Sequence, residues 1–166
     1  MDELQRQSDI LLENTERLNS DKLHRIPVFV DWNIGNFSVT SSHKIYSRWD
    51  YDWFRMSSRM MDFYFFSRVV SDVGDRTVWT YNVDPLQEDR FILFLKSYHT
   101  VYPLSETEIL SLKEVYRFFI LNYVMKEGRY FFHDIYADKL QNEAMESYFP
   151  NIDKFKPEVL LRALNL

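Results

Sequence analysis

An aspartate and an asparagine stand five residues apart between two short apolar segments. Asp31 and Asn36 fit the spacing Asp-x-x-x-x-Asn, with residues 28–30 before the loop and residues 37–39 after it. In phosphoryl transfer an aspartate can accept the proton of the attacking hydroxyl, and an asparagine five residues later can fold back to bind Mg²⁺. The spacing therefore predicts a loop with Asp31 as catalytic base and Asn36 as metal ligand.

A second carboxylate follows the next apolar segment. Asp50 comes after residues 45–49, which read as a strand joined to residues 37–39 through a polar turn. An aspartate at such a strand end can bridge Mg²⁺ to nucleotide phosphates, because Mg²⁺ prefers hard oxygen ligands and keeps water and phosphate for the rest of its shell. We assign Asp50 as a metal ligand and its neighbour Asp52 as a substrate contact.

Each of these features is common by itself. An Asp-x-x-x-x-Asn match is more simply an ordinary turn rich in aspartate and asparagine, and an aspartate after a strand is commoner still. The order strand, loop, strand, turn, strand and Asp50 is more specific than its parts. A helical module in which these residues coincide by chance remains an open alternative.

The rest of the chain supplies elements to hold the loop. Apolar residues recur on one face of a helix over residues 3–19, the loop and short strands occupy 26–50, and residues 58–166 are nearly all helical. Ser57 and Ser58 can cap a helix that runs to about Asp72, with Gly74 as its stop. Further elements are predicted as an extended stretch over 77–83 and helices over 84–99, from Ser105 to about Gly128, over 134–147 and over 157–165. We predict one α+β, mainly helical domain over 1–166.

Composition narrows the function classes. The chain has no cysteine, which excludes disulfides and thiolate chemistry, and its four histidines form no HxxxH pair. The net charge of −5 comes from interleaved acidic and basic residues, so nucleic acid is a poor partner. No apolar run is long enough to span a bilayer and no signal region follows Met1, so we expect a cytoplasmic protein with no membrane partner.

The loop also resembles that of a known enzyme family. Residues 30–36, Val-Asp-Trp-Asn-Ile-Gly-Asn, are similar to the His-Gly-Asp-(Phe/Leu)-His-Pro-Gly-Asn loop of aminoglycoside phosphotransferases and choline kinases. The resemblance implies that Asp31 is the base, Asn36 a metal ligand and Gly35 the loop glycine, which supports the loop. The family's loop histidine is replaced by Phe29, which removes a hydrogen-bonding prop without touching the proton acceptor.

Two later positions extend the resemblance. Residues 49–52, Trp-Asp-Tyr-Asp, look like the family's Ile-Asp-(Trp/Phe)-(Glu/Asp) segment, which places Asp50 on the metal-binding aspartate. Asp62 resembles the aspartate that opens the next helix and supports the loop. Mg²⁺ and ATP are the cofactor and co-substrate that the resemblance implies. Aromatic runs at 49–54 and 63–66 could form a cage for a quaternary ammonium, but core packing is the simpler interpretation.

The resemblance covers a C-terminal lobe. The family places a nucleotide-binding lobe before the loop, and residues 1–25 leave no room for it. We therefore expect part of an ATP-dependent small-molecule phosphotransferase that is inefficient alone and either self-associates or depends on a partner that supplies the N-terminal lobe. A non-catalytic relic of such a kinase and a helical interaction module are the alternatives.

Overall fold

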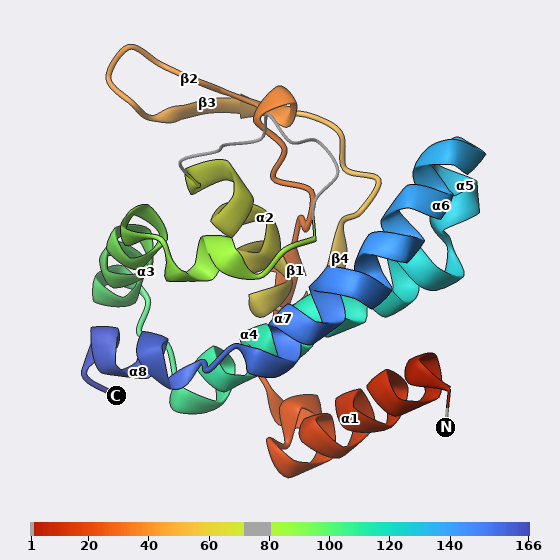
Figure 1. The fold of residues 1–166 in the computed structure, drawn as a ribbon. Helices are drawn as coiled ribbons and strands as arrows, with labels where there is room; N and C mark the ends of the chain where they lie inside the picture. Colours follow the sequence, from red (N-terminus) through yellow and green to blue (C-terminus); the bar gives the residue numbers. More distant parts are fainter. Residues whose placement is uncertain (1, 72–80) are drawn as a thin grey trace.

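A computed structural model describes residues 2–71 and 81–166. It confirms a mainly helical α+β fold, with two small antiparallel ladders near the N-terminus followed by helices (Figure 1). The strands are β1 (Arg25–Val28), β2 (Phe37–Val39), β3 (Ile45–Arg48) and β4 (Arg55–Ser58). The α-helices are α1 (Glu3–Arg17), α2 (Met60–Val70), α3 (Asp89–Val101), α4 (Glu106–Phe119), α5 (Gly128–Phe131), α6 (Asp134–Glu143), α7 (Phe149–Lys154) and α8 (Glu158–Leu164).

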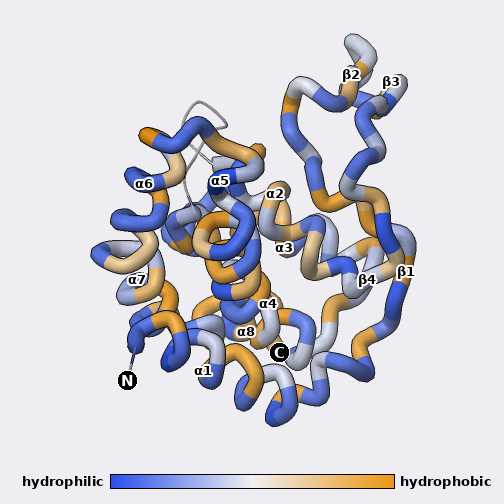
Figure 2. The backbone as a smooth tube through the Cα atoms, turned by 90° about the vertical axis from the view of Figure 1, so that its right-hand side faces the viewer, coloured by the Kyte–Doolittle hydropathy of each residue, from blue (hydrophilic) through white to orange (hydrophobic). Residues whose placement is uncertain are grey.

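The four strands form two antiparallel pairs. The β2–β3 hairpin lies in the chain between β1 and β4, which pair with each other. β2 pairs with β3, with Phe37 opposite Arg48, as the sequence predicts. β1 pairs with β4, with Val28 opposite Arg55, and everything between these two residues projects from the end of that ladder. In both views the β2–β3 hairpin stands away from the helical body (Figures 1 and 2).

β4 corrects one sequence prediction. Ser57 and Ser58 belong to β4, and α2 begins at Met60 with Arg59 as its N-cap; the Ser58 hydroxyl still accepts from the Met60 N–H over 3.3 Å. The strand has no alternation of apolar and polar side chains, because its sequence is Arg-Met-Ser-Ser. Its extended conformation comes from hydrogen bonding to β1, which only the tertiary structure provides.

The helices follow the predicted order with shifted ends. α1 ends at Arg17, two positions before the predicted end, and the helix expected over 84–99 is a 3₁₀ turn (η4, Asp84–Gln87) followed by α3. α6 continues through a π-helical turn (η6, Ala144–Tyr148) directly into α7. The predicted end of the helix at Asp72 and Gly74, and the start of the extended stretch at 77–80, lie outside the described residues.

α4 is the central helix of the body. A capping box starts it, in which Ser105 accepts from the Glu108 N–H and the Glu108 side chain accepts from the Ser105 N–H. After Phe119 the helix widens into a π-helical segment (η5, Ile120–Lys126). α4 packs against α1, α2, α7 and α8, and the more apolar parts of the chain gather around it (Figure 2).

Buried apolar side chains form one cluster that joins the helices to the base of the strands. Val28 and Val30 are buried in it together with Met60 and Phe63 of α2. The start of the predicted catalytic loop is thus anchored in the same core as the central helices. Among the described residues, no helix is both long and apolar enough to cross a membrane.

Candidate functional site

The nested hairpins bring the predicted loop and the predicted second carboxylate together. The loop with Asp31 leaves β1 and enters β2, and Asp50 follows the last residue of β3 by two positions. The Trp49 N–H donates to the Asn36 carbonyl oxygen over 3.0 Å, so Asn36 and Asp50 lie at the same end of the hairpin. Antiparallel pairing therefore places both predicted metal ligands next to the loop.

Asp31 is half-buried and held by the loop that carries it. Asn36 Nδ2 donates to Asp31 Oδ2 over 3.0 Å, and the Asn33 N–H donates to Asp31 Oδ1 over 3.3 Å. Burial raises the pKa of the Asp31 carboxyl, these two hydrogen bonds oppose that shift, and the negative charge of Asp50 adds to it. A raised pKa makes the carboxylate a better proton acceptor.

Asp50 and Asp52 occupy the exposed turn after β3. Asp50 has φ of 61°, a left-handed conformation that is uncommon for residues other than glycine. Asp50 Oδ1 accepts a long hydrogen bond of 3.5 Å from the Asp52 N–H. The structure brings Asp50 to Asn36 and Asp31, but Asp52 does not line the cavity described below.

Asp62 joins α2 to the start of the loop. Its Oδ1 accepts from the Phe29 N–H over 3.0 Å and from the Val30 N–H over 2.6 Å. Val30 has φ of 65°, which is strained for a β-branched residue and persists only where the surroundings hold it. Burial raises the pKa of the Asp62 carboxyl, and the hydrogen bonds from the loop oppose this shift. Asp62 therefore holds the backbone at the start of the loop, as the predicted supporting role requires.

Gly35 has an ordinary backbone conformation in the 3₁₀ turn η2 (Ile34–Asn36). Its N–H donates to Asn33 Oδ1 over 2.9 Å, and a Cβ at this position would meet that oxygen at 3.4 Å, an ordinary contact. The local geometry therefore shows no steric requirement for glycine here.

Arg48 belongs to the site although sequence reasoning did not select it. Its Nη2 donates to the Asp31 carbonyl oxygen over 2.8 Å, and its guanidinium lies 3.9 Å from the ring centre of Phe29 and 4.6 Å from that of Trp32. Burial lowers the pKa of Arg48, and nearby carboxylates oppose this. Phe29 therefore contacts the side chain of Arg48, which in turn bonds to the loop backbone, whereas the family's histidine would support the loop by a hydrogen bond. The sequence does contain a signal for Arg48. It stands two positions before Asp50 near a strand end, and residues two apart in a strand point to the same face.

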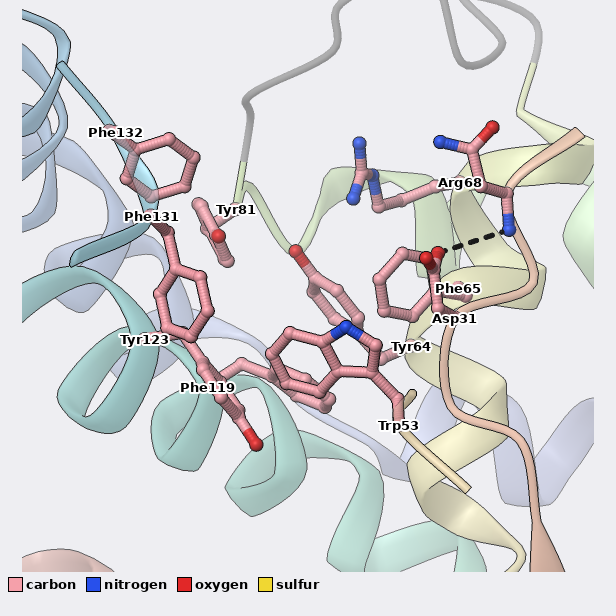
Figure 3. Close-up of a pocket in the computed structure, with 11 residues that line it drawn as sticks. Asp31, Trp53, Tyr64, Phe65, Arg68, Tyr81, Phe119, Tyr123, Phe131 and Phe132 are labelled. Atoms are coloured by element: carbon pink, nitrogen blue, oxygen red, sulfur yellow. Dashed lines mark hydrogen bonds between the residues drawn. The ribbon is translucent and has the colours of Figure 1, made fainter. Parts of the chain in front are cut away.

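A cavity of about 250 Å³ opens beside Asp31 (Figure 3). Asp31 and Asn33 line one part of it, and aromatic rings from α2, the α4–η5 helix and the end of α5 line most of the rest. The lining side chains are those of Asp31, Asn33, Trp53, Tyr64, Phe65, Arg68, Tyr81, Phe119, Tyr123, Phe131 and Phe132. π-Helical turns often occur at functional sites, and η5 carries Tyr123 into this wall.

The donor set suits a magnesium ion that arrives with a nucleotide. The Asn36 amide nitrogen is engaged with Asp31, so its oxygen is directed elsewhere, and the Asp50 carboxylate is exposed at the same hairpin end. Over 2–71 and 81–166, no three histidine or acidic side chains converge as a ligand group. Nucleotide-borne Mg²⁺ takes most of its ligands from phosphate and water, so one or two protein oxygens are sufficient.

Comparison of the chain with protein-family models, curated proteins and solved structures gives no match.

Proposed function

We propose that this chain forms the catalytic-loop portion of a phosphotransferase that moves a phosphoryl group from ATP to the hydroxyl of a small molecule. The observation that carries the proposal is the hydrogen bond between Asn36 and Asp31, five residues apart, with Asp50 at the same hairpin end. The similarity of this loop to that of the aminoglycoside and choline kinases supports the same assignment.

In this proposal Asp31 holds the acceptor hydroxyl and takes its proton. Asp31 lines the cavity, so an acceptor inside it can place a hydroxyl against the carboxylate. Asn36 and Asp50 bind Mg²⁺, which neutralises charge on the transferred phosphoryl group. Asp62 and Arg48 keep the start of the loop in position, because Asp62 accepts from the Val30 N–H and Arg48 donates to the Asp31 carbonyl oxygen.

Phosphoryl transfer also needs cations on the nucleotide phosphates. We propose that these come from a separate portion that docks beside the loop. An exposed group of apolar side chains, here called the hairpin face, lies on β3 and the turn after it. Its members are Ile45, Tyr46, Trp49, Tyr51 and Phe54. Large exposed apolar side chains are enriched at interaction surfaces, and Trp49 and Tyr51 are the chain neighbours of Asp50.

Nucleotide binding tests the proposal directly. The purified chain should bind ATP weakly and only with Mg²⁺, as measured by calorimetry, and Asp50→Ala should abolish this binding. Asp21→Ala changes an exposed carboxylate outside the site and should leave it unchanged. Binding that persists without Mg²⁺ or in Asp50→Ala would show that Asp50 is not a metal ligand.

The hairpin face also favours a second candidate, a non-catalytic interaction module. That function predicts partner binding that is lost when Tyr46 and Trp49 are both changed to Ser and that is unchanged in Asp31→Asn. Transfer of phosphate to any acceptor that is sensitive to Asp31→Asn would exclude the purely non-catalytic function.

A further inference from the structure

The cavity beside Asp31 has a charge pattern that argues against a cationic occupant. Among the described residues that line it, Asp31 is the carboxylate and Arg68 is the cation. Glu108, a buried carboxylate of α4, does not line this cavity and is bound to Arg59 over 2.6 Å. The cavity therefore lacks the several anions that would hold a polycation.

Protein cations already lie against the cavity's aromatic rings. The Arg55 guanidinium is 5.6 Å from the centre of the Trp53 ring, and its Nη1 donates to the Tyr123 hydroxyl over 3.3 Å. The Arg68 guanidinium is 5.3 Å from the centre of the Phe65 ring. A cation gains from an aromatic ring through the ring's negative face. Cations already beside these rings weaken that attraction for a cationic ligand and repel it.

An unsatisfied hydroxyl faces the same cavity. Tyr64 is 1% exposed, and its hydroxyl has no hydrogen-bond partner. Figure 3 shows the ring rising from α2 among the lining residues, with the hydroxyl directed toward the space near Tyr81 and Arg68. Burial raises the pKa of Tyr64 and Arg68 opposes this, but the pair does not have the geometry of a hydrogen bond. Buried hydroxyls normally have partners, so this donor indicates a place for a ligand acceptor.

We propose that the cavity binds a small, flat ring compound that carries an alcohol group and a second oxygen but no positive charge. The ring lies among the aromatic side chains, the alcohol hydrogen-bonds Asp31, and the second oxygen accepts from Tyr64. The volume of about 250 Å³ is just below the roughly 300–1,000 Å³ typical of ligand pockets, which favours a compact molecule.

This substrate class rests on the proposed function. The alcohol O–H proton passes to Asp31, and the alcohol oxygen forms a bond to the γ-phosphorus of ATP. The bond from that phosphorus to the bridging oxygen breaks, which releases ADP and leaves a phosphate monoester of the ring alcohol.

The test is calorimetric titration of the full chain, without nucleotide, with three probes. These are 4-hydroxybenzyl alcohol, 4-methylbenzyl alcohol, which lacks the second oxygen, and choline. We expect 4-hydroxybenzyl alcohol to bind about tenfold more tightly than 4-methylbenzyl alcohol, the size of one buried hydrogen bond, and choline to bind least.

Tyr64→Phe should remove the preference between the two benzyl alcohols without weakening 4-methylbenzyl alcohol. Tyr130→Phe, which changes a tyrosine that is 85% exposed, is the matched control and should keep it. Phe131→Ala shortens a half-exposed cavity residue and should weaken both alcohols. Because Tyr64→Phe removes only an unpartnered hydroxyl, the variant is expected to fold.

The outcomes separate this inference from the proposed function. Tighter binding of choline, equal binding of the two benzyl alcohols, or no binding at all would overturn the inference even if phosphate transfer to another acceptor were found. The expected affinities together with a failure to bind Mg²⁺-ATP would support the ligand chemistry and overturn the phosphotransferase proposal.

Discussion

Two arginines in this protein, Arg117, which is buried, and Arg48, which is half-buried, have opposite surroundings. Arg117 on α4 is 1% exposed and pairs with Glu114 over 2.8 Å and with Asp153 over 3.0 Å, and it also donates to Gln7. Arg48 on β3 stacks on Phe29 and Trp32, and its hydrogen bond goes to a backbone carbonyl.

The difference shows that arginine and carboxylate side chains stabilise the fold around Arg117 but are kept apart from direct pairing around Arg48. The carboxylates around Arg117 are neutralised by ion pairs that join α1, α4 and α7. Among the described residues, Asp31 and Asp50 form no ion pair, because Arg48 is held by aromatic rings instead. Because, within the part of the chain that the structure describes, neither carboxylate is in direct contact with a protein cation, both remain able to bind a metal or accept a proton. The following predictions test that contrast.

The largest expected effect is on catalysis. With the nucleotide-binding portion present, Asp31→Asn should lower turnover by about 10²–10⁴, the usual contribution of a positioned base. The loss can be smaller, because phosphoryl transfer depends more on positioning than on deprotonation. Steady-state kinetics of phosphate transfer measures it, and unchanged turnover would show that Asp31 is not the base.

The ion-paired arginine should matter to stability and not to chemistry. Arg117→Met leaves Glu114 and Asp153 without their buried partner, so the free energy of unfolding should fall by about 3–5 kcal/mol. Arg129 pairs with Asp134 and Asp138 on the surface, and Arg129→Met should cost only about 0–1 kcal/mol. Urea denaturation measures both. Equal losses would remove the distinction between structural and exposed pairs.

Arg48 should affect the loop and the titration of Asp31. Arg48→Leu removes a hydrogen bond and cation–π contacts, so the free energy of unfolding should fall by about 1–3 kcal/mol. The charge of Arg48 lowers the pKa of Asp31, so its removal should raise that pKa and move the acid limb of the pH–rate profile to higher pH. A profile that shifts to lower pH would contradict this electrostatic role.

Asp31 should also have a stability cost that depends on pH. Its folded-state pKa is raised, so the folded protein holds the proton more tightly than the unfolded chain does. The stability from this group is complete below the unfolded pKa of about 3.9 and is lost as the pH rises through the raised folded value. Asp31→Asn should therefore be more stable than the wild type at pH 7, and the gain should vanish toward pH 3. Thermal unfolding of both proteins between pH 3 and pH 7 measures this gain. A gain in stability that grows as the pH falls would contradict the prediction.

The smallest effect is expected at Gly35. Since a Cβ there meets only Asn33 Oδ1, at 3.4 Å, Gly35→Ala should change the free energy of unfolding by less than about 0.5 kcal/mol. Thermal denaturation and the transfer assay together measure it. A large loss in either would mean that the glycine is required by the complete site and not by the local backbone.

The sequence by itself determined most helices and the order of loop, hairpin and second carboxylate. Apolar spacing in α1 and α4, the capping box at Ser105 and the pairing of β2 with β3 depend on residues close together in the chain, so local patterns reveal them. The five-residue separation of Asp31 and Asn36 likewise predicted a local contact that the fold contains.

Only the tertiary structure decided what surrounds that contact. β4 has no strand pattern and exists because β1 pairs with it, and the π-helical turn η5 widens α4 without any sequence signal that we recognised. Arg48, Asp62 and the cavity wall come from separate elements that meet only in the folded chain. Contacts between distant segments depend on packing of the whole core, which spacing along the chain does not encode.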